Sequence, residues 1–414
     1  MPRIHGSIEQ RRRAAGLTSL PLAGRLPCAL VLTLLLAKGG PVEGTPESRA
    51  SVLFLLISPS ARVNGMGQAG VALPDEPAGY YNPGAAALSS PARTVQSRLY
   101  LSEMPWLPGF ADDMTYAYHA VQAAGARPVP APSWWGPTSL AAALYGSRTK
   151  MDLGQLTILD AGNAGEPSDA VDTSNNLGVS LALRSFVQVG VGATSKWVSS
   201  DRGGSKGSAR AHDVGLMVVA PLTAILERLT GVELALSPSL LPRLEVGYGI
   251  AWHNRGPRFA YTPSVTGDDP LPANRRNGWS GRLGMDWRSG SLRLAVVEAT
   301  LSRETYRPQI EGVQATSLSD DDKRGFEVSI LETICFRRGK SDDFDGEVRF
   351  ETSGETIRSD GFFRYMAHHL ESQPPGSSRD ALLFLARHLS ISWSRFVYHP
   401  KWPARGHAYL GLSF

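Results

Sequence analysis

Apolar and polar residues alternate strictly in four segments of the chain, at 187–197, 245–253, 279–288 and 389–394. In the first of these, VQVGVGATSKW, valines, an alanine and a tryptophan lie at alternate positions, and the positions between them are polar or glycine. Successive side chains of a β-strand point to opposite faces. This period of two therefore predicts strands with one apolar and one polar face.

The apolar faces of these predicted strands include large aromatic residues, at Trp197, Trp252, Trp279 and Trp287. The opposite faces are rich in glycine, serine and charged residues. A transmembrane antiparallel β-barrel needs an outward apolar band with aromatic ends and a polar or small-residue interior. A soluble β-sandwich alternates in the same way, so alternation by itself leaves both all-β architectures open.

Turn residues divide the predicted strands unevenly. Short turns fall at 184–185, at 288–291 and at 238–242, where two prolines follow a predicted strand VELAL (232–236). Longer polar stretches are expected to be loops on the other rim, at 160–175, 200–211, 254–276, 312–323 and 339–358. Short turns on one rim and long loops on the other are typical of a transmembrane barrel.

The last eight residues, HAYLGLSF (407–414), alternate again and end on an aromatic residue. A terminal apolar strand with a free edge would aggregate in water. In a closed barrel the last strand pairs with the first, and the edge disappears. We therefore interpret Tyr409, Leu410, Leu412 and Phe414 as a barrel-assembly signal, with the barrel-assembly machinery as an expected partner.

The N-terminal residues 1–44 have the pattern of an export signal. Three consecutive arginines, Arg11 to Arg13, precede an apolar run at 26–36, which is too short to span a bilayer and fits a cleaved secretory signal. An uncleaved anchor helix is the alternative. No later segment reaches about 18 consecutive apolar residues, as a transmembrane helix requires.

Charge and composition exclude several classes of function. The net charge of +4 comes from the N-terminal 44 residues, so the rest of the chain is neutral and is not expected to bind nucleic acid. After cleavage only Cys335 of the two cysteines remains, and no intrachain disulfide can form. No catalytic set and no metal-ligand spacing is evident, so we expect no enzymatic activity, cofactor or metal.

The stretch ARVNGMGQAGVALPDEPAGYYNPGAAAL (61–88) fits neither a strand nor a good helix. Its glycines loosen the backbone, and its prolines interrupt any regular ladder. It also contains valines, leucines, a methionine and two tyrosines, which a solvated linker would not use. The stretch is therefore expected to be a compact, packed, irregular element.

Two segments resemble a known group of proteins. Residues 54–88 resemble the N-terminal segment of PorV-like and FadL-like outer-membrane β-barrels, and GFEVSILETICFRRGKSDDF (325–344) is similar to a late strand and loop of the PorV-like members. The positions that match in the first segment are Ala61, Arg62, Gly65, Met66, Gly67, Ala69, Asp75, Tyr81, Asn82, Pro83 and Gly84.

The resemblance implies a barrel of about 14 strands over residues 91–414, in the outer membrane of a diderm bacterium. It also implies that residues 45–90 fold inward as a plug. The plug residues expected to matter are Gly65, Met66, Gly67, Tyr81, Asn82 and Pro83. A tight turn at Asn82-Pro83-Gly84 would close the plug, or alternatively gate a ligand path.

Two functions from different classes follow from the resemblance. The first is a partner-binding barrel for protein export or surface attachment, with outer-membrane lipid around it and secretion-system proteins as partners. The second is transport of hydrophobic small molecules, such as long-chain fatty acids. An apolar cavity under residues 61–88 would favour transport, whereas a filled lumen with long ordered loops on one rim would favour docking.

Overall fold

The computed structural model describes residues 50–74, 76, 79–89, 95–106, 113–131, 138–160, 163–203, 205–262, 268–290, 292–312, 320–343, 348–371, 376, 379–382, 384, 389–399 and 405–412. The expected export signal, residues 1–44, lies outside these ranges, as do Asp75 and Phe414. The cleaved signal therefore remains a prediction, as does the boundary between plug and barrel.

One antiparallel sheet contains every strand of the described residues. Fourteen of them follow one another in a continuous path of hydrogen-bonded neighbours, which confirms the predicted number. They are β1 (Val95–Pro105), β2 (Thr115–Pro128), β3 (Ser139–Asp160), β4 (Asn163–Arg184), β5 (Gln188–Arg202), β6 (Lys206–Pro221), β7 (Leu240–Arg255), β9 (Asn274–Ser289), β10 (Leu292–Pro308), β11 (Asp321–Ile330), β12 (Ile334–Asp343), β13 (Val348–Arg358), β14 (Leu389–His399) and β15 (Arg405–Leu412). The three-residue β8 (Ala260–Thr262) pairs with the start of β6.

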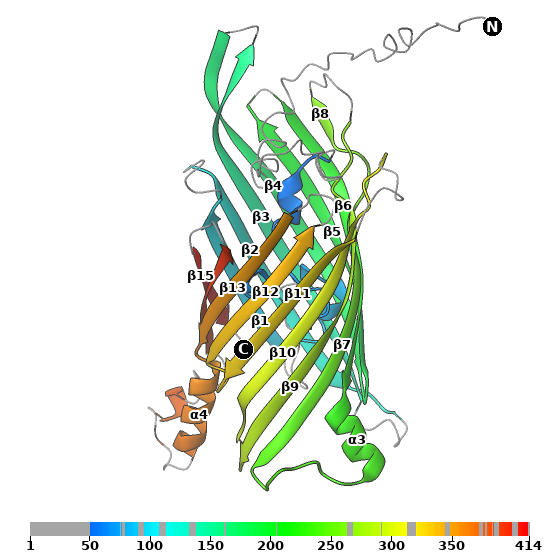
Figure 1. Ribbon diagram of the computed structural model, residues 1–414, viewed down its shortest axis with the longest axis vertical. Helices are drawn as coiled ribbons and strands as arrows, with labels where there is room; N and C mark the ends of the chain where they lie inside the picture. Colours follow the sequence, from blue (N-terminus) through cyan, green and yellow to red (C-terminus); the bar gives the residue numbers. More distant parts are fainter. Residues whose placement is uncertain are drawn as a thin grey trace, which may run out of the picture.

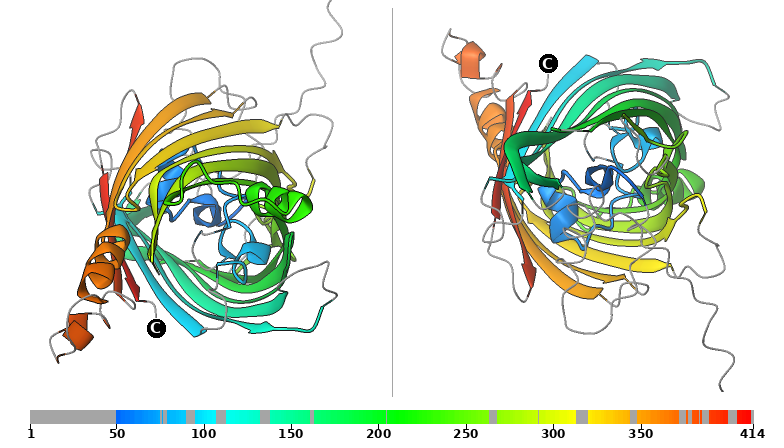
Figure 2. Two further views of the ribbon diagram at one scale, coloured as in Figure 1. Left: turned by 90° about the horizontal axis from the view of Figure 1, so that it is seen from below. Right: turned by 90° about the horizontal axis from the view of Figure 1, so that it is seen from above.

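The sheet curls into a cylinder around the N-terminal segment (Figure 2). Its two edge strands, β1 and β15, lie next to each other. No ladder of hydrogen bonds joins these two strands in the described residues, so the expected pairing of the last strand with the first is not made.

The outside of the cylinder is apolar. Leu181 on β4 is 54% exposed and Leu283 on β9 is 59% exposed, and the valines, leucines and tryptophans of neighbouring strands also face outward. The alternating inward positions carry glycines and buried polar side chains, such as Ser180 and Ser280. The apolar stripes therefore do not meet between two sheets, and the soluble sandwich is excluded. A single sheet with this exterior is built to cross a lipid bilayer.

Three of the five expected loops are instead largely β-structure. Residues 160–175, 200–211 and 339–358 belong to the β3–β4, β5–β6 and β12–β13 hairpins, and most of them lie in the strands themselves. The prediction failed because their polar side chains suggested loops, whereas a hairpin satisfies its backbone hydrogen bonds whatever its side chains are. The other two stretches, 254–276 and 312–323, do contain the loops after β7 and β10.

The β3–β4 hairpin rises above all other strands at one end, here called the upper rim (Figure 1). Two helices lie at the opposite, lower rim: α3 (Leu222–Thr230) and α4 (Asp360–Glu371). Residues 232–236, predicted as a strand, lie instead in the irregular segment that follows α3. Every helix among the described residues is too short or too polar to span a membrane.

Candidate functional site in the lumen

The plug, meaning described residues between 50 and 89, fills the lumen (Figure 2). It contains three short helical turns, η3 (Leu53–Leu56), α2 (Ala61–Gly65) and η5 (Pro83–Ala85). Ser60 caps α2, since its hydroxyl accepts the Val63 N–H at 3.2 Å. Asn82 caps η5 in the same way, because its Oδ1 accepts the Gly84 N–H at 3.0 Å.

Asn82 also ties this turn to the rest of the molecule. Its amide nitrogen donates to the carbonyl oxygens of Val71, at 3.0 Å, and of Leu216 on β6, at 2.9 Å. The Asn-Pro-Gly turn predicted inside the lumen is therefore present and is fully used by structural hydrogen bonds. This arrangement fits the expectation of a closing turn better than that of a gate.

Wall glycines allow the plug backbone to touch the barrel directly. A Cβ on Gly192 of β5 would collide with the carbonyl of Pro83, and one on Gly215 of β6 would collide with Oδ1 of Asn82. Conversely, a Cβ on Gly84 would come within 2.6 Å of the carbonyl oxygen of Gly190. We call Gly190, Gly192 and Gly215 the glycine seat; it explains the glycines on the inner face of β5.

Gly65, Met66 and Gly67 pack on the opposite part of the wall. A Cβ on Gly325 of β11 would lie 2.5 Å from Met66, and one on Gly339 of β12 would collide with Gly67. Gly67 itself has a φ of +65°, which L-residues rarely adopt, and it faces the Lys340 backbone. A side chain at this position would therefore be strained and would also collide with β12. The two segments that carry the family resemblance, 54–88 and 325–344, thus pack against each other.

Glu327 on β11 holds the plug at this contact by charge. It accepts two hydrogen bonds from Nε of Arg62, at 3.0 and 3.1 Å, and one from Nη2 at 2.7 Å. Arg337 on β12 pairs with the same carboxylate, and Arg62 also donates to Glu76 at 3.2 Å. All four side chains are buried, so each charge depends on its partners for stabilisation.

Glu304 on β10 makes a second charged contact. Its Oε2 accepts the backbone N–H groups of Gly70 and Val71 at 2.8 and 2.9 Å, and its Oε1 lies 3.4 Å from Nη1 of Arg276. We call Glu304 and Glu327 together the carboxylate seat. A carboxylate can accept both N–H groups at once, so it fixes the plug backbone without needing a plug side chain.

A third network surrounds Tyr81. Its hydroxyl bonds to Ser58 and accepts the Ser60 N–H at 3.2 Å, and its carbonyl oxygen lies 3.0 Å from Nε2 of His253. His253 Nδ1 is 3.3 Å from Asp213, which also pairs with Lys196 at 2.7 Å. This set superficially resembles a catalytic triad, but its third partner is a backbone carbonyl, which is not a nucleophile.

The structure thus brings all six predicted plug residues, Gly65, Met66, Gly67, Tyr81, Asn82 and Pro83, into the lumen. Whether they serve a ligand remains a prediction. The described part of the predicted assembly signal, Tyr409, Leu410 and Leu412, lies on β15. Sequence reasoning missed Glu304 and Glu327; the signal was a carboxylate on the glycine-rich inner face of a strand.

The lumen leaves little free space. An interior hollow beside Tyr80, His253 and Arg276 has a volume of about 10 Å³, which is room for about one water. A larger hollow of about 520 Å³ lies on the outer face of β11–β14, where Phe336 is 53% exposed. Within the described residues, no group of three His, Cys, Asp or Glu side chains is placed to hold a metal ion.

Comparison with known proteins adds little. No family model matches the chain, and no curated protein matches it. The Ralstonia pickettii toluene transporter TbuX is similar in structure, with a TM-score of 0.37 and 13% identity over 86% of this chain and 96% of that one. OccAB3 of Acinetobacter baumannii has a TM-score of 0.28 and 8% identity over 77% and 97% of the two chains.

The Bordetella pertussis alcaligin outer membrane receptor FauA follows, with a TM-score of 0.25 and 12% identity over 78% of this chain and 56% of that one. Likenesses this weak carry no argument. The assignment rests on the chain's own fold: a curled, 14-stranded antiparallel sheet with a lipid-facing exterior and a polar, plugged interior. The protein is an outer-membrane β-barrel of a diderm bacterium.

Proposed function

We propose that this barrel binds a protein partner and serves protein export or surface attachment, as the resemblance to PorV-like barrels implies. The observation that supports this most is the filled lumen. The plug side chains are buried against the wall, and the hollow beside Tyr80, His253 and Arg276 is polar and only about 10 Å³, whereas a transporter of hydrophobic molecules needs an apolar cavity. The plug acts as a fixed internal strut that keeps the barrel rigid.

The β3–β4 hairpin offers the partner a surface. The ladder from β2 reaches β3 only as far as Asp152, and the ladder from β5 reaches β4 only as far as Ala170. Beyond these residues the described strands form ladder hydrogen bonds only with each other, and the Gln155 N–H on the outer edge of β3 donates to the Asp113 carboxylate at 3.2 Å (Figure 1). The outer edges of this hairpin at the upper rim can accept a strand from another protein. Secretion-system proteins are the partner class that fits.

Shortening this hairpin tests the proposal. Replacing residues 155–169 with an Asn-Gly turn should abolish a native-gel complex between the barrel and its partner in membrane extracts. The shift in gel mobility on boiling should be unchanged, because the shortened part lies outside the barrel wall. Lys206→Gln, which removes the exposed Lys206–Asp201 pair on the neighbouring hairpin, is the matched control and should leave the complex intact.

The alternative is transport of hydrophobic small molecules. The hollow on the outer face of β11–β14 favours it, because phenyl and guanidinium groups together suit a long-chain carboxylate. Its lining includes Phe326, Val328, Phe336, Arg338, Glu355 and Arg395. Transport would show as saturable uptake of a labelled fatty acid that Arg338→Ala weakens and hairpin shortening leaves unchanged. Complex formation without such uptake supports partner binding.

A further inference from the structure

Two arginines on the outside of the barrel flank one tryptophan. The guanidinium carbons of Arg255 and Arg275 lie 5.7 and 5.9 Å from the ring centre of Trp252 on β7. In the described chain neither arginine has an acidic partner. Arg255 donates to the Gln309 amide oxygen at 2.9 Å, and Nε of Arg275 is buried without a hydrogen-bond partner.

Neighbouring outward arginines are different. Arg303 on β10 pairs with Asp322 at 2.9 Å, and Arg307 donates to Asp320 at 2.7 Å. Both are therefore neutralised by the protein itself. Arg255 and Arg275 instead present two positive charges to whatever surrounds the barrel, held in place over an aromatic face.

A bulge in β7 places Arg255 on the outside. Regular alternation after Trp252 would direct residue 255 inward, but His253 and Asn254 are both buried and Arg255 is exposed. The β6–β7 register shifts at this point, and Asn254 has a φ of +56°. The Asn254 N–H donates to Asp213 at 2.8 Å, and Lys196 donates to Asn254 Oδ1 at 2.8 Å.

The buried network next to Tyr81 therefore fixes an external side chain. Bulges are a general way to re-aim a side chain at the rim of a barrel. Here the bulge gives Arg255 the same outward direction as Trp252, and the β7–β9 ladder sets Arg275 directly opposite Trp252. Trp252, Arg255 and Arg275 therefore lie together because the strand ladder and the buried hydrogen bonds of the bulge hold them there.

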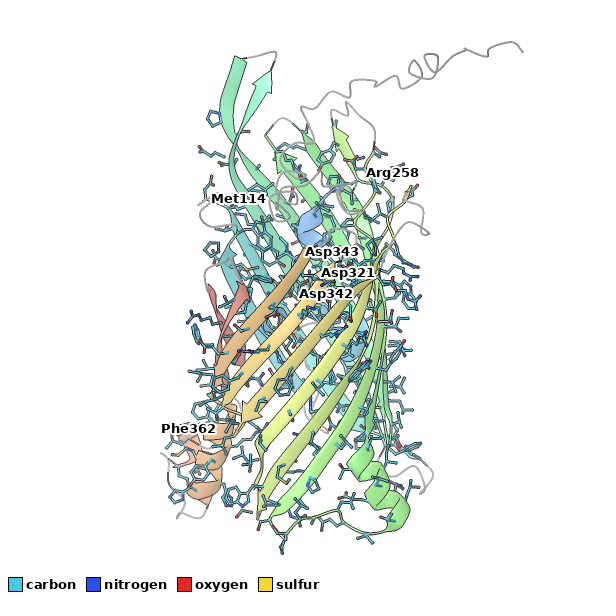
Figure 3. All side chains as sticks on the ribbon, viewed as in Figure 1. Met114, Arg258, Asp321, Asp342, Asp343 and Phe362 are labelled. Carbon is cyan, nitrogen blue, oxygen red and sulfur yellow. The ribbon has the colours of Figure 1, made fainter. Side chains whose placement is uncertain are left out.

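The cluster borders the upper end of the apolar band, where a barrel wall meets lipid headgroups. β7 ends at Arg255 and β9 begins at Asn274, at the end where the loop containing Arg258 lies (Figure 3). The turns at Gly290 and at 331–333 are at the other rim, so we infer that the upper rim is the extracellular one. Below Trp252 on the same face come Ile250 and Tyr248, within the apolar band.

We propose that Arg255 and Arg275 bind a phosphate group of the phosphorylated glycolipid of the outer leaflet. Guanidinium forks bind phosphate in a bidentate way, and two of them can share one phosphate between them. The indole of Trp252 supports the sugar and the start of the acyl chains, as interfacial tryptophans do. This proposal is independent of the proposed function, since it concerns the lipid-facing side of the wall.

Native mass spectrometry of the purified full barrel with added bisphosphorylated lipid A tests the site. The wild type should bind one lipid A that persists through detergent exchange. R255A/R275A should weaken binding by about tenfold or more, because two charge-assisted contacts are lost. R255K/R275K keeps the charges but not the forks and should lie in between. Arg148→Ala, which removes an exposed arginine on β3, should bind as the wild type.

Three other outcomes of this experiment would contradict the proposed lipid site. Unchanged binding by R255A/R275A, with folding verified by the gel shift on boiling, would overturn the proposal. Equal binding of dephosphorylated lipid A would show that phosphate is not recognised. Full displacement by inorganic phosphate at millimolar concentration would show a site for free anions rather than for a membrane lipid.

Discussion

The plug is held in two chemically different ways on two sides of the lumen. At the glycine seat on β5 and β6, backbone packs on backbone around Asn82 and Pro83, and the described residues form no ion pair with the plug there. At the carboxylate seat on β10 and β11, Glu304 and Glu327 reach inward and bind Arg62 and two backbone N–H groups. The β5–β6 side fixes the plug by shape, whereas the β10–β12 side adds buried charges to the close packing at Gly325 and Gly339.

The difference indicates how each side tolerates change. A shape contact fails when any atom is added, because interiors are close-packed and backbone cannot move aside. A charge contact fails when one partner is removed, since the remaining charge stays buried and uncompensated. Substitutions that keep size but change charge, or keep charge but change size, therefore separate the two seats.

The largest effect is expected at Glu327. Glu327→Gln leaves Arg62 and Arg337 buried without their shared carboxylate and should lower the free energy of unfolding by about 3–5 kcal/mol. Urea unfolding in detergent micelles, followed by tryptophan fluorescence, measures it. Glu351→Gln, at an exposed outward position on β13, is the control and should change little. A loss as small as that of the control would mean that the charges are not coupled.

Gly192→Ala should have the next largest effect and lower the free energy of unfolding by about 1–3 kcal/mol. The added Cβ collides with the backbone of Pro83, so either the plug or β5 must shift. Gly281→Ala adds the same atom where nothing lies within 4 Å and should be neutral. Limited proteolysis, which detects a displaced plug, together with urea unfolding measures the difference. Equal behaviour of the two variants would show that the glycine seat is not close-packed.

Glu304→Gln should lower the free energy of unfolding by about 1–2 kcal/mol. The amide oxygen still accepts the Gly70 and Val71 N–H groups, although these bonds lose their charge. Arg276 loses an ion pair of 3.4 Å but keeps its contacts with Asn274 and with the ring of Tyr306, so its charge is not left without partners. The same unfolding experiment reports it. A loss as large as that of Glu327→Gln would contradict the view that backbone contacts at this seat tolerate a neutral acceptor.

Tyr81→Phe should have the smallest effect and lower the free energy of unfolding by about 1 kcal/mol, because it removes only the hydroxyl bonded to Ser58 and Ser60. Tyr365→Phe, on the exposed face of α4, should have none. Hydrogen exchange of residues 58–66 should speed up in the first variant alone. If exchange does not change, this hydroxyl does not order the plug.

The sequence predicted the wall well and the contacts poorly. Alternation is a local property, so the outward stripes of β5, β7 and β9 were evident from their own residues. The pair Arg62–Glu327 joins residues 265 positions apart, and no local pattern shows which inward carboxylate meets which arginine. The bulge at Asn254 was missed for a similar reason, since it depends on Asp213 of another strand.

Electrical conductance across a planar bilayer tests the central claim, that a fixed plug fills the lumen, most directly. Ser302 Oγ lies 2.8 Å from the Ala69 carbonyl, so cysteines at these two positions can be joined by a short crosslinker. The account predicts no steady ion current through the wild type or through A69C/S302C, with or without the crosslink, and a large current after residues 50–89 are deleted. A steady current through A69C/S302C that the crosslink blocks would contradict it.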